Sequence, residues 1–236
     1  MARSVLGLFV LLSCCLYVSH AVLGIDMSLQ TCESVSSSVW TCLKNNGFSF
    51  AIIEAWNGGY QYDKNIANCV SQAWAAGMAH VDVYAFMCPY CTGNNPPSTA
   101  VTTLVNNLKS QGVQYGMLWF DIEQCDGCWG SFDTNINFLE EAVNTAVSLG
   151  VKVGIYTSEY EWGVTVGSSC TAFKSYPLWY ADWDDVPAFD DAWAWEFGGW
   201  TTPAIKQYYD QGPCANVDVD YYPSSMIEYF QNYTRY

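Results

Sequence analysis

The sequence has few basic residues for its size. It contains 8 Lys and Arg against 23 Asp and Glu, which gives a net charge of −15 in 236 residues. Nucleic acids and anionic lipid surfaces repel such an acidic chain, and we therefore exclude both as partners. Low-complexity linkers and blocks of like charge are also absent, so nothing in the composition divides the chain into several domains.

Histidine is nearly absent. The two histidines are His20, in an N-terminal segment that we expect to be removed, and His80, which we expect to be structural. The chain also lacks a Gly-x-Ser-x-Gly turn, the usual setting of an exposed nucleophilic serine. These two absences argue against a histidine-based catalytic triad.

Long apolar runs are missing after the first 20 residues. The N-terminal run extends from Val5 to about Val18, follows Arg3, and leads to the small-x-small sequence at 19–21. This pattern predicts a secretory signal peptide over residues 1–21, whereas a membrane anchor would need about 20 apolar residues. We therefore expect one domain over residues 22–236, secreted or delivered to a lysosomal or phagosomal lumen, with a net charge of −16 and no membrane span.

Nine cysteines follow the predicted signal peptide, and an odd number leaves at least one without a partner in the same chain. Two Cys-x-x-Cys pairs, at 88–91 and 125–128, have a spacing that can bind zinc. In a secreted protein we favour disulfides over zinc, and the spacing alone leaves their connectivity open.

Short β-rich runs alternate with helical patterns. Three amphipathic stripes, near residues 66–74, 101–108 and 136–146, each end a few residues before a glycine and predict helices. The candidate strands are Leu23–Met27, Phe50–Ala55, Val81–Phe86, Gly116–Glu123, Lys152–Thr157, Leu178–Asp182, Ile205–Tyr209 and Val217–Tyr221.

This alternation predicts βαβ units around a largely parallel sheet, and eight strands suggest a closed barrel. Only 10 residues separate Tyr208 from Asp218, too few for a crossover helix. The fold class we expect is therefore α/β, an irregular (β/α) TIM-like barrel with degenerate last units joined by short loops.

The sequence WFDIE at 119–123 has the clearest chemical content. Residues two apart in a strand point to the same side, so the Cα atoms of Asp121 and Glu123 should lie about 6.6 Å apart on one face. Two carboxylates on an otherwise apolar strand repel each other, and one of them tends to keep its proton near neutral pH. A carboxylic acid beside a carboxylate is the basic equipment for cleaving a glycosidic bond.

Acids and tyrosines also end the other predicted strands, where the active sites of such barrels form. Asp26 could instead cap the following segment, Asp182 could begin a turn, and Tyr84 and Tyr156 could complete the barrel core. The residues at these ends are Asp26, Glu54, Tyr84, Asp121, Glu123, Tyr156, Asp182, Tyr208 and Asp218.

Eight segments match, in order, the motifs of one enzyme family. They are GIDMS (24–28), AWAAGM (73–78), HVDVYAF (80–86), LWFDIE (118–123), GIYTS (154–158), PLWYADWD (177–184), GGWTTPAIKQYY (198–209) and NVDVDYY (216–222). With its acids in place, the chain resembles glycoside hydrolase family 25, the Chalaropsis-type lysozymes, and in particular the branch found in protists and invertebrates.

The resemblance implies hydrolysis of the β-1,4 bond between N-acetylmuramic acid and N-acetylglucosamine in peptidoglycan. Glu123 would be the general acid, and Asp121 would stabilise the transition state or position the substrate's acetamido group, with Asp26 as a further catalytic acid. The remaining candidates, for substrate binding, are Asp218, Asp182, Tyr84 and Tyr156. The family implies no cofactor and no metal, and we expect a monomer with a digestive or antibacterial role.

One residue departs from the family pattern. Many relatives have a lysine or arginine where this chain has Glu54, so a cation near the mouth would be missing, and Glu54 would be a further cleft acid or a turn residue. Two other functions stay open: a non-catalytic sugar-binding protein on the same barrel, and a hydrolase of chitin-like polymers. The negative charge also suggests an acidic working pH, because protonation would weaken repulsion from an anionic wall.

Overall fold

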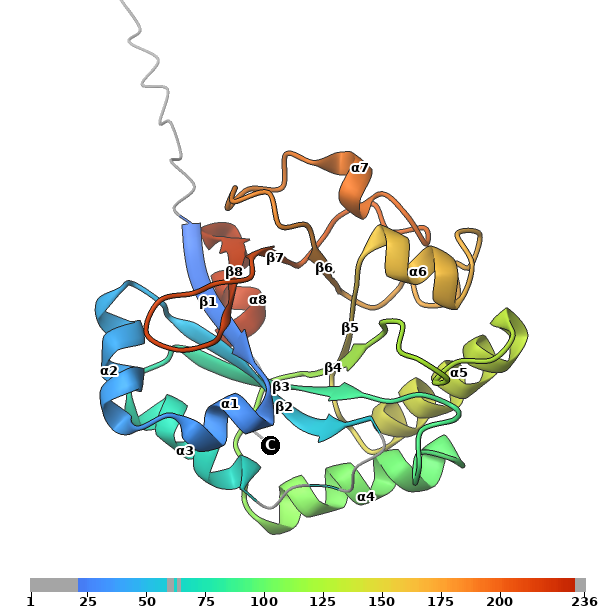
Figure 1. Ribbon diagram of the computed structural model, residues 1–236, viewed down its shortest axis with the longest axis horizontal. Helices are drawn as coiled ribbons and strands as arrows, with labels where there is room; N and C mark the ends of the chain where they lie inside the picture. Colours follow the sequence, from blue (N-terminus) through green and yellow to red (C-terminus); the bar gives the residue numbers. More distant parts are fainter. Residues whose placement is uncertain (1–20, 59–61, 63–64, 232–236) are drawn as a thin grey trace, which may run out of the picture.

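The computed structural model describes residues 21–58, 62 and 65–231. Eight strands form a closed barrel in which each strand pairs with the next and the last pairs with the first (Figure 1). The strands are β1 (Ala21–Met27), β2 (Phe50–Asn57), β3 (His80–Phe86), β4 (Leu118–Asp121), β5 (Val153–Thr157), β6 (Leu178–Ala181), β7 (Ile205–Tyr209) and β8 (Asp218–Pro223). The predicted barrel is thereby confirmed. Most of the predicted signal peptide lies outside the described residues.

The end of the barrel is irregular, as expected. Strands β1 to β7 pair in parallel, whereas β8 runs antiparallel to both β7 and β1. The segment from β7 to β8, all of which the structure describes, is a loop without a helix, because it is too short for a crossover. This antiparallel return brings the C-terminal end of β1 beside the start of β8, where Asp26 faces Asp218.

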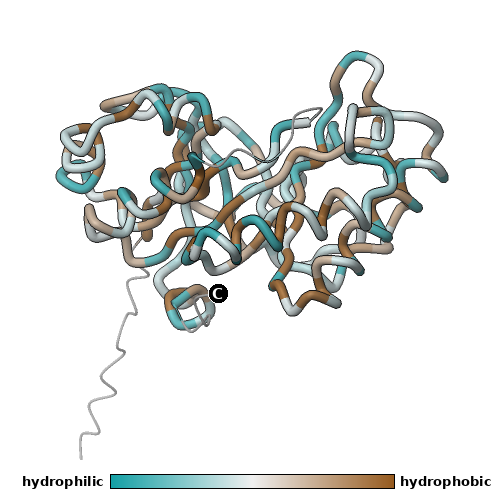
Figure 2. Tube along the Cα trace, turned by 90° about the horizontal axis from the view of Figure 1, so that it is seen from below, coloured by the Kyte–Doolittle hydropathy of each residue, from teal (hydrophilic) through white to brown (hydrophobic). Residues whose placement is uncertain are grey.

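Helices surround the barrel (Figure 1). The three predicted helices are α3, α4 and α5, and two more, α1 and α2, connect β1 to β2. The helices are α1 (Leu29–Ser34), α2 (Ser37–Asn45), α3 (Ile66–Ala75), α4 (Pro97–Ser110), α5 (Phe132–Ser148), α6 (Glu159–Thr165), α7 (Ala192–Trp195) and α8 (Ile227–Gln231), the last preceded by the 3-10 turn Ser224–Met226. Figure 2 shows hydrophobic stretches running through the middle of the molecule and hydrophobic and hydrophilic residues alternating along the outer helices. No helix in the described part of the chain has the length and apolar character needed to cross a bilayer.

The predicted strand over 116–123 is too long at its end. Strand β4 stops at Asp121, and Glu123 lies beyond it in a loop. Glu161 accepts from the backbone N–H of Gln124 at 2.6 Å, and the indole of Trp129 donates to the backbone oxygen of Glu123 at 2.7 Å. The N–H of Ile122 still donates to the backbone oxygen of Tyr156 on β5, and the two loop contacts hold Glu123 on the same side as Asp121 just beyond the strand.

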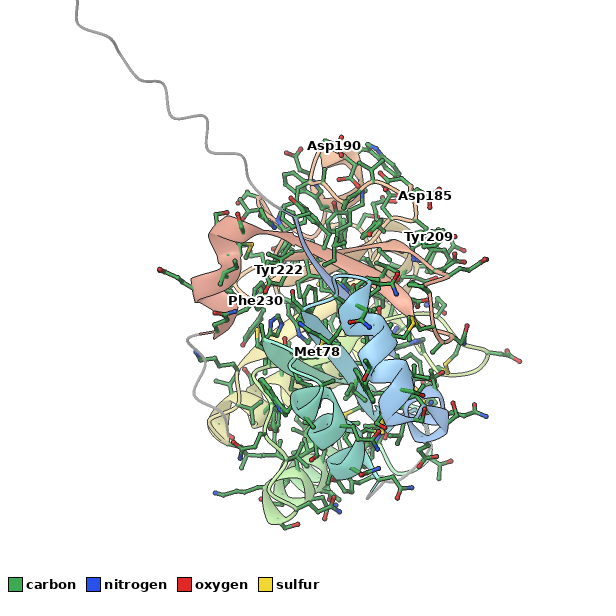
Figure 3. The ribbon with its side chains drawn as sticks, turned by 90° about the vertical axis from the view of Figure 1, so that its left-hand side faces the viewer. Met78, Asp185, Asp190, Tyr209, Tyr222 and Phe230 are labelled. Atoms are coloured by element: carbon green, nitrogen blue, oxygen red, sulfur yellow. A yellow bond between two sulfur atoms is a disulfide. The ribbon has the colours of Figure 1, made fainter. Side chains whose placement is uncertain are left out.

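The N-terminal end of the barrel is filled by aromatic rings. The imidazole of His80 stacks between Phe50 and Phe230, at ring-centroid distances of 4.8 and 5.2 Å. Burial lowers the pKa of His80 to about 3, so its ring is neutral and acts as a packing element, in line with the structural role we expected. Figure 3 shows Tyr222 and Phe230 together, away from Asp185 and Tyr209 at the other end.

Eight of the nine cysteines that follow the predicted signal peptide form four disulfides, the bonds that we expected in a secreted protein. The pairs are Cys32–Cys69, Cys42–Cys214, Cys88–Cys91 and Cys125–Cys128, and Cys170 is the free, buried thiol. Both Cys-x-x-Cys pairs thus close local loops. The bond between Cys42 and Cys214 is different, because it ties the end of α2 to the loop between β7 and β8.

Candidate active site

A pocket opens at the C-terminal ends of the strands, where barrel active sites form. Six of the seven predicted site residues line it, and two residues that were not predicted complete it. The lining residues are Asp26, Tyr84, Asp121, Glu123, Tyr156, Trp179, Gln207 and Asp218. The barrel therefore brings together carboxyl groups that lie up to 192 residues apart in the sequence.

Gln207 connects four groups of this pocket. Its amide nitrogen donates to Asp26 at 2.7 Å and to Asp218 at 3.4 Å. Its amide oxygen accepts from the hydroxyl of Tyr156 at 2.9 Å and from the indole of Trp183 at 2.8 Å. Because all its hydrogen-bonding groups have partners, Gln207 holds the two aspartates and fixes its own orientation. The alternative that Asp26 caps α1 is wrong, since Ser28 accepts from the N–H of Thr31 there.

Asp121 and Glu123 form a close carboxyl pair despite the short strand. Their side chains share a hydrogen bond. Burial, and then the negative charge of Glu123, raises the pKa of Asp121 well above its ordinary value, while burial and the charge of Glu161 raise the pKa of Glu123. The second oxygen of Asp121, Oδ1, is buried without a partner among the described residues. The pair therefore keeps a proton in the pocket and leaves one acceptor ready for another molecule.

The tyrosines of the pocket are neutral donors. Burial and the surrounding carboxylates raise the pKa values of Tyr84 and Tyr156 well above the ordinary value. The ring of Tyr156 lies 4.3 Å from that of Trp179, so both also form an apolar wall of the pocket. Flat rings with polar tips suit contact with sugars.

Asp182 does not line the pocket and belongs to a different cluster. Strand β6 ends at Ala181, and Asp182 follows on the same side as Tyr180, whose hydroxyl donates to Asp191. The backbone N–H of Asp184 donates to the oxygen of Asp182 at 3.0 Å, which supports the turn alternative. Asp182 was a wrong choice for the pocket because strand alternation directs it away from the barrel axis.

The cluster around Asp182 contains a buried cation. The ammonium of Lys206, whose side chain is 0% exposed, lies 2.8 Å from Asp184 and 2.7 Å from Asp191. Burial raises the pKa of the neighbouring Asp182 to about 6. This cluster fastens the loop after β6, which carries Trp183, to strand β7.

Glu54 also has a structural role. Its carboxylate accepts from the backbone N–H of Leu29 at 3.0 Å and from the amide of Asn57 at 2.8 Å, which stabilises the start of α1. It does not line the pocket, and neither does any lysine or arginine in the described part of the chain. The pocket is thus acidic with no basic lining residue, as the departure at Glu54 suggested.

Trp179 and Gln207 are the lining residues that sequence reasoning missed. Both are uncharged, and the search was directed at acids and tyrosines. Each nevertheless lies within a predicted strand, Gln207 at its middle, and Trp179 faces inward two residues before Ala181. All inward-facing positions of these strands, and not only the acids and tyrosines at their ends, are therefore candidates for lining the pocket.

Comparison with known proteins agrees with this geometry. A family model described as "Lysozyme-like protein 1" matches residues 21–208. "Counting factor 50" of Dictyostelium discoideum is 48% identical over 91% of this chain and 71% of its own length. "Probable GH family 25 lysozyme 4" of the same organism is 39% identical over 87% of this chain and 92% of its own. A family GH25 lysozyme structure from Aspergillus fumigatus shares the fold, with a TM-score of 0.71 at 21% identity over 90% of this chain and 99% of its own. The chain therefore belongs to the lysozymes of glycoside hydrolase family 25.

Proposed function

We propose that this protein is a secreted muramidase that hydrolyses the β-1,4 bond between N-acetylmuramic acid and N-acetylglucosamine in peptidoglycan. The observation that carries the proposal is the hydrogen-bonded pair of Asp121 and Glu123 with raised pKa values, in a pocket that also holds Asp26 and Asp218. The similarity to Dictyostelium discoideum proteins that are named as probable family 25 lysozymes supports the same reaction.

In this mechanism the proton of the pair is delivered from Glu123 to the oxygen of the leaving sugar. The positive charge that develops on the other sugar is stabilised by the carboxylate of Asp26, until a water molecule adds to the anomeric carbon and returns a proton to Glu123. The free oxygen of Asp121 accepts the N–H of the substrate's acetamido group, or stabilises the charge directly. The neutral hydroxyls of Tyr84 and Tyr156 orient the sugar without adding charge.

Activity and stability should both be greater at pH 5 than at pH 8. The general acid works only while the pair keeps its proton, so kcat/KM should fall as pH rises through the raised upper pKa of Asp121 and Glu123. Burial raises the pKa of Asp218 to about 6 and that of Asp82 to about 7, from ordinary values of 3.8. The folded state thus binds these protons more tightly than the unfolded chain, and the free energy of unfolding should fall between about pH 4 and 7.

The test of this dependence is a kcat/KM profile on soluble peptidoglycan together with urea unfolding at both pH values. An activity maximum above pH 7 at low salt would contradict the assignment of a protonated pair. Equal unfolding free energies at pH 5 and pH 8 would show that Asp82 and Asp218 titrate normally.

A second candidate function is sugar binding without catalysis. The 48% identical relative is named as a counting factor and not as an enzyme, which is the observation that favours this alternative. Both functions use the same pocket, so they differ in whether bonds are broken.

The deciding experiment is digestion of purified peptidoglycan with mass analysis of the fragments, in parallel with chitin oligomers. Muramidase activity should release fragments that end in reducing N-acetylmuramic acid and leave chitin oligomers intact. Cleavage of chitin oligomers without cleavage of peptidoglycan would show that the protein is a chitin-type glycosidase. Binding to peptidoglycan without new reducing ends would support the non-catalytic alternative.

A further inference from the structure

Asp220 lies one layer below the acids of the pocket. On the paired strands β1 and β8, Asp26 faces Asp218, and Gly24 faces Asp220. A side chain at Gly24 would collide with the ring of Phe50, since an added Cβ would lie 2.3 Å from it. With only a glycine opposite, the carboxyl of Asp220 lies inside the barrel and is 0% exposed.

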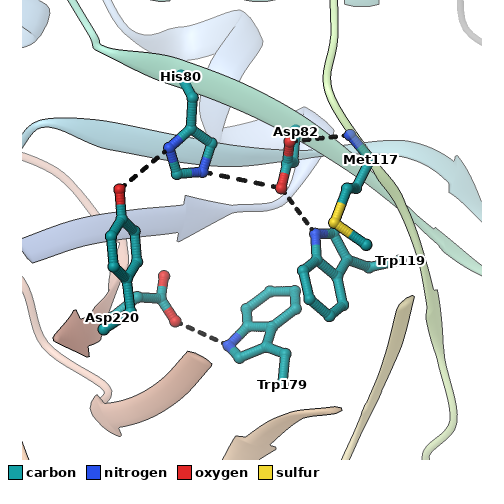
Figure 4. Close-up of polar contacts among 7 residues, drawn as sticks. His80, Asp82, Met117, Trp119, Trp179 and Asp220 are labelled. Atoms are coloured by element: carbon teal, nitrogen blue, oxygen red, sulfur yellow. Dashed lines mark hydrogen bonds and ion pairs between the residues drawn. The ribbon is translucent and has the colours of Figure 1, made fainter. Parts of the chain in front are cut away.

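The two oxygens of Asp220 have different environments. One accepts from the indole N–H of Trp179 at 2.8 Å (Figure 4). The other oxygen, Oδ2, is buried without a hydrogen-bond donor among the described residues. The carboxyl of Asp26, two positions along the paired strand, lies within hydrogen-bonding reach of the carboxyl of Asp220. A hydrogen bond between two carboxyl groups requires a proton on one of them, because two carboxylates have only acceptors.

The surroundings favour that proton on Asp220. The groups that face it are the carboxyls of Asp26 and Asp218, the neutral indole of Trp179 and, more distantly, the phenol of Tyr208. Lys206, on the neighbouring strand, is turned to Asp184 and Asp191. Burial, followed by the negative charge of Asp26, raises the pKa of Asp220 well above its ordinary value. Burial and the charge of Asp218 also raise the pKa of Asp26, but Asp26 is the acid of the two that accepts a hydrogen bond from Gln207, which favours its charged form.

We propose that Asp220 is a positioning residue that stays protonated and donates a hydrogen bond to Asp26, so that Asp26 is held as a carboxylate from below by Asp220 and from the side by Gln207. This role rests on the proposed function, in which the carboxylate of Asp26 stabilises the developing positive charge. No proton leaves Asp220 during the reaction.

Two substitutions at this position distinguish the proposal from a merely structural role. Asp220→Asn keeps an acceptor for Trp179 and a donor for Asp26, so kcat/KM and both limbs of its pH profile should change by no more than about threefold. Asp220→Leu removes both, and kcat should fall by about 10- to 100-fold with KM little changed, because Asp26 loses its donor. A large loss or a displaced pH limb in Asp220→Asn would overturn the proposal, as would native activity in Asp220→Leu.

Asp82 supplies the matched control. Its carboxyl is also fully buried and accepts from an indole, that of Trp119, at 2.9 Å, but it has no contact with Asp26 (Figure 4). Asp82→Leu and Asp220→Leu should both lower the unfolding free energy, and only Asp220→Leu should lower kcat when activity is expressed per folded molecule. Equal loss of kcat in the two variants would assign the effect to packing and overturn the proposal.

Infrared spectroscopy tests the protonation without any substrate. The difference spectrum between the native protein and Asp220→Asn should contain the carbonyl band of a protonated carboxyl group, unchanged across about pH 5 to 8. If the band is absent, Asp220 is ionised and the proposal fails, whatever the activity. If the band is present and peptidoglycan is not cleaved, the protonation holds and the proposed function fails.

Discussion

Replacing Glu123 with glutamine is expected to lower kcat on peptidoglycan by about 10³-fold and to leave the fold and substrate binding intact. Glutamine has nearly the same shape and cannot donate a proton to a leaving oxygen, and general acid catalysis contributes about 10²- to 10⁴-fold. The side chain is partly exposed in a loop, where its backbone oxygen is held by Trp129, so the substitution disturbs no core packing. The measurement is the initial rate of wall clearing together with the release of reducing ends.

The control for this experiment is Glu54→Gln, the same substitution at a buried carboxyl that does not line the pocket. Its activity should stay within about twofold of the native value, since the single amide oxygen of glutamine can still accept from the N–H of Leu29 and only the bond from Asn57 is lost. If the Glu123→Gln variant cleared bacterial walls at the native rate, Glu123 would not be the general acid. A similar loss in both variants would indicate a general effect of charge on the acidic pocket.

Replacing Lys206 with methionine should give the largest loss of stability of any single lysine. The substitution leaves Asp184 and Asp191 without their cation, and removing one partner of a buried ion pair costs about 3 to 5 kcal/mol. For a domain of this size that corresponds to a decrease in Tm of roughly 6 to 15 °C. Thermal unfolding followed by circular dichroism at neutral pH measures it directly.

The pH dependence of the same variant is informative. Below the pKa of Asp182, which burial raises to about 6, protonation relieves part of the repulsion among the three aspartates. The loss of Tm should therefore be smaller at pH 5 than at pH 7.5. Lys109→Met, at an exposed position near the end of α4, should shift Tm by no more than about 1 °C. Equal losses in the two lysine variants would show that the buried cluster adds nothing to stability.

The strands and most of the site were predictable because both depend on local patterns. The alternation of β-rich runs and helical stripes predicts a barrel of parallel strands. In such a barrel the C-terminal ends of the strands lie at one end of the molecule, which is enough to bring Asp26 and Asp121 together. The exact end of β4 was not predictable, because it depends on contacts of Gln124 and Trp129 with groups distant in sequence or in the loop. The position of Asp182, by contrast, was predictable, because strand alternation past the end of β6 already directs its side chain away from the barrel axis.

Residues without charge, or one layer below the mouth, were harder to identify. Gln207 acquires its importance from four partners on other elements, and no spacing in its own segment indicates them. Asp220 differs from Asp218 by two positions on one strand, so sequence alternation places both on the inner face. Asp220 is buried below the pocket, whereas Asp218 lines it, and this difference depends on how Gly24, Phe50 and Trp179 pack around Asp220.

The pairing of β8 with β1 has a consequence for how the protein matures. During synthesis a ribosome completes Asp26, Asp121 and Glu123 long before Asp218, which belongs to the last strand of the barrel. The nascent chain thus carries Glu123, the proposed proton donor, before the opposing carboxyl group of Asp218 exists, and Cys42 has no partner until Cys214 is synthesised. A competent catalyst can arise only after translation has delivered the final strand, when ring closure and this long-range crosslink complete the molecule together.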